Sequence, residues 1–178
     1  VPGLAAKARA PRPAPYFHEF LTPPEQVVAV RAARLFDAKT GAILSNQIVL
    51  IRGDRIADVG SSVVVPSGAT VIDLGSATLL PGLIDAHVHT YGPGSDPHER
   101  AIAAVANAQK DLQAGFTTVM DMDSRGGYGT VDLRNAINAG IVDGPRMQVV
   151  GQSLNQRASG AYDAVSPPFA DTFTVNKN

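Results

Sequence analysis

Cysteine is absent from the 178 residues of this sequence. Disulfide bonds and thiolate metal sites are therefore excluded within it, and any metal that it binds must be held by nitrogen and oxygen ligands. The lack of cysteine does not indicate the cellular location, because a cysteine-free chain suits oxidising and reducing surroundings equally. A cytoplasmic protein and a secreted or periplasmic one, processed ahead of Val1, both stay open.

The chain also lacks an excess of charge and a long apolar run. Charged residues make up 17% of it and the net charge is −1. Nucleic-acid binding would call for clustered lysine and arginine, so we expect no nucleic-acid partner. A membrane-spanning helix needs about 20 apolar residues in a row, and we expect no membrane span. What is present, 44% hydrophobic residues, is typical of a globular protein.

Three regions follow one another along the chain. The first, residues 1–25, is a proline-rich tail in which extended backbone is favoured over helix. The second, residues 26–80, consists of short apolar segments separated by turn residues, which predicts a small all-β unit. Its clearest hairpin surrounds Gly53 and Asp54, a pair suited to a tight turn. The third, residues 81–178, alternates strand and helix patterns.

The alternation in the third region predicts parallel βα units. Strands are expected at "GLIDAHVH", "FTTVMDM" and "RMQVVG". The first helix is expected to begin at Asp96 as its N-cap with Pro97 in the first turn, and to end at Gly115. The second is expected over residues 130–139. Spacings of three and four predict a stripe on the first helix that faces a partner: Ile102, Val105, Ala106, Gln109 and Leu112.

Two histidines close the first of these strands. Because alternate side chains of a strand share a face, Asp85, His87 and His89 are expected on one face, and Ile84 and Val88 on the face beneath a helix. The two histidines would then be about 6 to 7 Å apart at the backbone, which lets both rings reach one cation. Asp85 is placed as an outer-shell neighbour of such a site. A chance His-x-His pair without metal is the alternative.

Other polar side chains are weaker candidates. The glycine-rich loop "DSRGGYGT" lacks the lysine and residue order of a phosphate-binding loop. Its Arg125 could meet a substrate carboxylate, or it could form a structural ion pair with Asp121 or Asp123. His18, alone in the tail, and His98, in a helix first turn, are not expected to be ligands.

Three segments in order, "LLPGLIDAHVH", "AGFTTVMDMDSRGG" and "INAGIVDGPRMQVVG", closely resemble the amidohydrolase superfamily. More narrowly, they resemble the branch of Xaa-Pro dipeptidase-like carboxypeptidases related to imidazolonepropionase, and the match runs from about Val27 to Gly151. The resemblance implies an α/β fold. Residues 26–80 would be a small β-sandwich portion, and residues 81–178 the first three βα units of a (β/α)8, TIM-type barrel.

The resemblance also implies a binuclear metal centre, usually zinc. It makes His87 and His89 ligands of the more buried metal. A carboxylated lysine on the fourth strand, histidines on the fifth and sixth and a proton-handling aspartate on the eighth complete the family's site. Those strands are not in this sequence, so no catalytic residue is expected within it. The remainder would belong to the same longer protein or to a second, cleaved chain.

The activity implied by the resemblance is hydrolysis of an amide by metal-activated water. The substrate would be a dipeptide or an N-acyl amino acid, cleaved as a carboxypeptidase cleaves it, and a homo-oligomer is implied as well. One alternative is cyclic-amide hydrolysis of the imidazolonepropionase type. The other, from a different class, is a catalytically inactive structural or interaction module.

Overall fold

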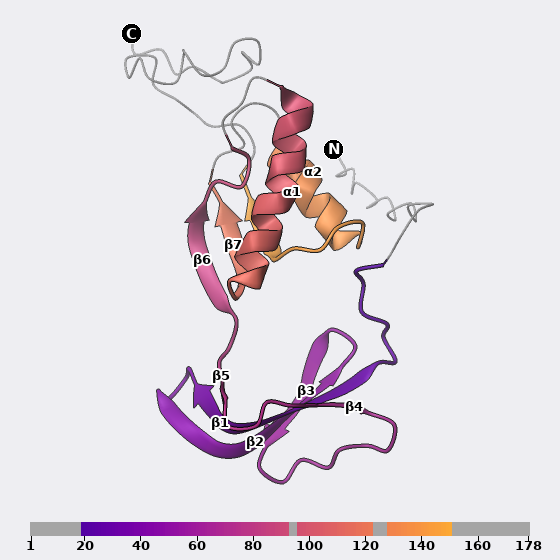
Figure 1. Ribbon diagram of the computed structural model, residues 1–178, viewed down its shortest axis with the longest axis vertical. Helices are drawn as coiled ribbons and strands as arrows, with labels where there is room; N and C mark the ends of the chain where they lie inside the picture. The colour runs from indigo at the N-terminus through magenta and orange to yellow at the C-terminus, as the bar shows by residue number, and fades with distance from the viewer. Residues whose placement is uncertain (1–18, 93–95, 123–127, 151–178) are drawn as a thin grey trace, which may run out of the picture.

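The computed structural model of the protein describes residues 19–92, 96–122 and 128–150. These residues form two sheets and two helices (Figure 1). In chain order the elements are β1 (Val27–Asp37), β2 (Ala42–Arg52), β3 (Arg55–Gly60), β4 (Thr70–Asp73), β5 (Thr78–Leu79), β6 (Leu83–Val88), α1 (Pro97–Gln113), β7 (Phe116–Asp121), α2 (Gly129–Asn138) and β8 (Arg146–Val149).

The first sheet contains β1 to β5, in the order β3-β2-β1-β4, with β5 also paired to β1. β2 and β3 form the predicted hairpin, in which Arg52 is the partner of Arg55 across the turn. Gly53 has a φ of 56°, and Asp54 is not among the residues with positive φ. This is the pattern expected of a type II′ turn, which needs glycine only at its first central position.

The five strands form a single layer in the part of the chain that the structure describes. A sandwich requires a second layer, so that part of the expected fold stays a prediction. The sheet leaves large apolar side chains in contact with solvent, including Ile56, Val71 and Ile72. Val71 and Ile72 are consecutive in β4 and so lie on opposite faces of the sheet. Exposed apolar side chains on a sheet are typical of surfaces that other layers cover.

The second sheet is parallel, with strand order β6-β7-β8. α1 packs on β7, α2 packs on β8, and the two helices contact each other on the same side of this sheet (Figure 1). A doubly wound sheet would carry helices on both faces, whereas helices on one face are the arrangement of a (β/α)8 barrel wall. The mixed α/β class is therefore observed, and barrel closure stays a prediction.

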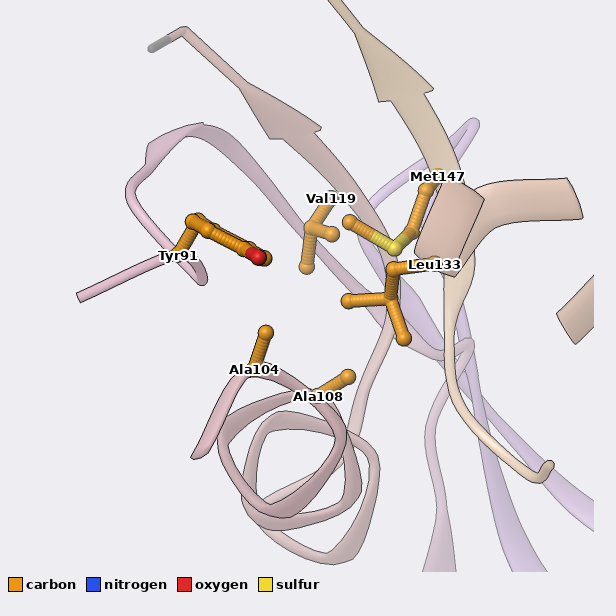
Figure 2. Packing of buried hydrophobic residues seen from close by; sticks show 6 residues of the cluster. All are labelled: Tyr91, Ala104, Ala108, Val119, Leu133 and Met147. Carbon is orange, nitrogen blue, oxygen red and sulfur yellow. The ribbon is translucent and has the colours of Figure 1, made fainter. Parts of the chain in front are cut away.

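The core of this half lies between the sheet and the two helices. Figure 2 shows its six buried side chains converging from α1, β7, α2, β8 and the segment after β6. They are Tyr91, Ala104, Ala108, Val119, Leu133 and Met147. The two alanines on α1 let that helix approach the sheet closely, and the larger side chains fill the space opposite them.

α1 begins and ends where the sequence predicts. The Asp96 carboxylate accepts hydrogen bonds from the backbone N–H groups of His98 (2.7 Å) and Glu99 (3.3 Å). Pro97 occupies the first turn, and Gly115 ends the helix with a φ of 97°. Both are the expected terminal signals.

The predicted stripe of α1 is confirmed only in part. The buried positions are Arg100, Ala104 and Ala108, and Val105 of the stripe packs against the core, whereas Ile102 is 73% exposed. Close packing against the sheet selects the small residues, and no described element covers the larger Ile102. The same holds for Ile84 on β6, which is 71% exposed although it was expected beneath a helix. β6 is an edge strand of this sheet, and only its Val88 packs against the core.

Candidate metal centre

His87 and His89 lie at the carboxyl end of β6, one within the strand and one just beyond it. Their imidazole rings meet edge to face, with centroids 5.1 Å apart and an interplanar angle of 86°. Two imidazoles that bind one tetrahedral zinc ion at about 2.0 to 2.1 Å have centroids about 5 Å apart. Both side chains are exposed. The pair therefore fits two positions of a nitrogen-ligated metal site.

The strict alternation expected along β6 is interrupted between Asp85 and Val88. Asp85 is in register with Val119 and Val88 with Asp121, so β6 contains one more residue than β7 over this stretch. The extra residue is a β-bulge, a device that re-aims side chains. Asp85 supports it, because its carboxylate accepts a hydrogen bond of 3.0 Å from the His87 backbone N–H. Asp85 thus contacts the histidine pair through the backbone, and its outer-shell role stays a prediction.

Thr90, the residue after His89, is 2% exposed and tied to two other elements. The Asp121 carboxylate, at the end of β7, accepts from the Thr90 backbone N–H (2.8 Å) and from its hydroxyl (2.5 Å). The Asn107 side-chain amide on α1 donates to the Thr90 carbonyl oxygen (3.0 Å). The contacts of Thr90 with Asp121 and Asn107 were not predicted from the sequence. The one signal for them was Asp121, an acidic residue at the end of an apolar strand.

The segment after Thr90 is held by Tyr91 and Arg100. The Tyr91 hydroxyl donates to the Pro97 carbonyl oxygen (3.1 Å), and the Arg100 guanidinium lies 4.8 Å from the centre of the Tyr91 ring. Arg100 Nε also donates to the Gly92 carbonyl oxygen (3.1 Å). A cation over an aromatic face and buried hydrogen bonds both favour one conformation of this segment.

Asp111 on α1 lies near two other carboxylates. Its pKa is raised above its ordinary value, first by burial and then by repulsion from Asp85 and Asp121. Asp111 is therefore harder to ionise in the fold than in water.

The remaining sequence candidates do not join this site. Arg125 and His18 lie outside the described residues. His98 is exposed in the first turn of α1. Within the described ranges, no group of three or more histidine, cysteine, aspartate or glutamate side chains could hold a metal ion. A metal at His87 and His89 therefore needs further ligands from elsewhere.

Neither described helix has the length and hydrophobicity that a bilayer crossing requires.

A hollow lies at the first sheet. It has a volume of about 330 Å³ and is lined by residues 25–27 and 66–70. Glu25 is its one ionisable lining residue. Its lining contains no histidine, so the histidine pair at the carboxyl end of β6 is the better candidate for metal binding.

Comparison with known proteins places residues 78–173 within the model of the amidohydrolase family, so the matched stretch contains the histidine pair. A dihydroorotase from Leifsonia xyli subsp. xyli is 30% identical over 138 residues. That alignment covers 67% of this chain and 31% of the dihydroorotase.

Two solved structures have the same arrangement of elements. A Xaa-Pro dipeptidase with methionine bound in its active site is 28% identical, with a TM-score of 0.70 over 85% of this chain and 39% of its own. A prolidase in complex with N-methylphosphonate-L-proline is also 28% identical, with a TM-score of 0.66 over 74% of this chain and 33% of its own. This chain thus spans roughly a third of the length of the proteins that it matches.

Proposed function

Because this chain belongs to the amidohydrolase family, we propose that the encoded protein is a metal-dependent hydrolase that cleaves an amide bond. One observation carries the proposal above all. The two imidazoles at the carboxyl end of β6 lie 5.1 Å apart, inside the segment that matches the family. The carboxyl ends of barrel strands are where enzymes of this architecture place their chemistry.

In the proposed site, His87 and His89 hold one metal ion through their ring nitrogens. A metal ion at such a site lowers the pKa of a bound water and polarises the scissile carbonyl. The Asp85 carboxylate fixes the backbone N–H of His87. Zinc is the proposed metal, because imidazole nitrogens suit it and the family resemblance implies it. The further ligands and the proton-handling aspartate lie on segments outside this sequence.

The proposed substrate is a dipeptide or an N-acyl amino acid. The likeness to a Xaa-Pro dipeptidase and to a prolidase that binds a proline phosphonate supports a peptide bond next to a free carboxylate. Arg125, which follows β7 in the sequence, is proposed to meet that carboxylate. A homo-oligomer stays a prediction that rests on the family resemblance.

Cyclic-amide hydrolysis is the second candidate, and the sequence relatives favour it. Dihydroorotases are similar to this chain at 30% and 38% identity in two cases. Dihydroorotate contains its amide within a ring, so the reaction class is the same and the substrate shape differs. The loops that would select between the two shapes are not all within this chain.

The test uses the complete encoded protein, loaded with zinc or treated with a chelator. Xaa-Pro dipeptides, N-acetyl amino acids and dihydroorotate are offered separately, and product is measured by chromatography. We expect cleavage of one class, lost on chelation and restored by zinc. Zinc-loaded protein that hydrolyses none of the three would contradict the proposal and favour the structural or interaction module.

A further inference from the structure

The polar groups of Thr90 are all engaged, which is unusual for a residue in a connecting segment. Its N–H and hydroxyl both donate to Asp121 Oδ2, and its carbonyl accepts from Asn107. Thr90 is 2% exposed and Asp121 is fully buried. Burying a carboxylate is costly unless its oxygens receive hydrogen bonds. Thr90 supplies two such donors to Oδ2, so Asp121 and Thr90 stabilise each other's placement.

The contact continues the hydrogen bonding between β6 and β7 past the point where the strands end. The Val88 carbonyl accepts from the Met122 backbone N–H (3.1 Å), and the Asp121 carbonyl accepts from the Val150 backbone N–H (3.1 Å). Beyond Val88, the Asp121 side chain replaces the backbone as the acceptor for β6. His89 lies between these two attachments, at Val88 and Thr90.

We propose that Asp121 is a positioning residue for the metal site, acting through Thr90 on the backbone of His89. This inference rests on the proposed function. A ligand held on a fixed backbone loses less conformational freedom when it binds a metal, and outer-shell partners of ligands change metal affinity by about 10- to 100-fold. Asp121 is not a ligand in this scheme. It keeps His89 where its ring can join that of His87.

The test compares Thr90→Val with Thr90→Ser in the complete encoded protein. Valine has nearly the shape of threonine and lacks the hydroxyl, whereas serine keeps the hydroxyl. Zinc affinity is measured by competition with a chromophoric chelator, and the Tm of the metal-free protein is measured beside it. We expect Thr90→Val to weaken zinc binding by about 10- to 100-fold, and Thr90→Ser to stay close to the wild type.

A second variant covers the case in which Thr90→Val does not fold. Asp121→Asn keeps the side-chain shape and one acceptor oxygen but removes the charge, so we expect a smaller loss of zinc affinity in the same direction. Unchanged zinc affinity in the folded variants, with only the Tm lowered, would overturn the positioning role and leave a structural one. Equal losses in Thr90→Val and Thr90→Ser would overturn it as well.

The two proposals fail in different ways. Wild-type protein that binds no zinc would overturn the metal-dependent function, and the positioning role with it. Wild-type protein that binds zinc, beside variants that bind it equally well, would overturn the positioning role alone.

Discussion

His87 and His89 are the proposed zinc ligands, and single substitutions test that role. In the complete encoded protein, His87→Ala or His89→Ala removes a ring nitrogen that binds the metal. We therefore expect zinc affinity to fall by more than about 100-fold, the largest loss usual when a residue that only supports a ligand is changed. Hydrolysis should fall with it. Metal content after dialysis, measured by mass spectrometry of the elements, gives the answer.

His98→Ala is the matched control for those two variants. His98 is exposed in the first turn of α1 and is not among the proposed ligands. We expect it to retain the zinc content of the wild type. Stoichiometric zinc in His87→Ala or His89→Ala would refute the ligand assignment.

Gly129 is a second single residue with a measurable role. A Cβ at this position would lie 2.4 Å from two ring atoms of Tyr91, which is buried in the core. Tyr91 would have to move away from Pro97 and Arg100. We therefore expect Gly129→Ala to lower the free energy of unfolding by about 1 to 3 kcal/mol, the usual cost of overpacking.

Gly92→Ala provides the comparison, because a Cβ there meets no atom within 4 Å and its φ is not in the left-handed region. Denaturant unfolding of both variants is the measurement. Equal stability of Gly129→Ala and Gly92→Ala would show that the contact of Gly129 with Tyr91 does not constrain the fold.

At the scale of elements, α1 carries a titratable group whose effect on stability has a definite sign. The folded state raises the pKa of Asp111 above 3.8, chiefly through burial. The ionised form is therefore disfavoured in the fold, and this cost is absent below the unfolded pKa and present at neutral pH. We expect Asp111→Asn to be more stable than the wild type at pH 7, and the difference to vanish as the pH falls below about 4.

Asp37, the last residue of β1, should behave in the opposite way. Hydrogen bonds from the Thr40 hydroxyl and the Lys39 backbone N–H lower its pKa below 3.8. Its contribution to stability is present above the unfolded pKa and lost as the pH falls through the folded value. Asp37→Asn should thus lose stability at neutral pH. Urea unfolding at two pH values checks both variants, and a gain in Asp37→Asn or a loss in Asp111→Asn at pH 7 would contradict the electrostatics described here.

Elements with local signals could be predicted from the sequence, and features set by packing could not. The Gly53 turn, the Asp96 N-cap and the end of α1 at Gly115 depend on neighbouring residues alone. The rotation of α1 depends on how closely its alanines approach the sheet, which periodicity does not encode. That is why Ile102 was expected inside and lies outside.

The candidate site also has some features that the sequence predicted and others that it did not. The His-x-His spacing predicted that the two rings approach each other, and their centroids are 5.1 Å apart. The bulge between Asp85 and Val88 was not predicted, because a one-residue difference between paired strands is a property of two segments. The bond between Thr90 and Asp121 joins residues 31 positions apart, so only the pairing of β6 with β7 reveals it.

At the scale of the whole molecule, much apolar surface faces solvent in the described residues. Ile84 and Ile102 are 71% and 73% exposed, and β6 and β8 are edge strands of their sheet. Exposed apolar patches and open edges favour association. We expect a polypeptide limited to these 178 residues to bind a hydrophobic dye and to self-associate in size-exclusion chromatography. A dye-free monomer would contradict the need for covering segments, and the complete encoded protein is the control.

Metal location is the measurement that tests the central proposal most directly. Crystals of the complete encoded protein, grown with zinc, are measured on both sides of the zinc absorption edge. We predict an anomalous peak about 2.0 to 2.1 Å from a ring nitrogen of His87 and from one of His89. Zinc bound elsewhere, with neither histidine in contact with it, would contradict the assignment of this site.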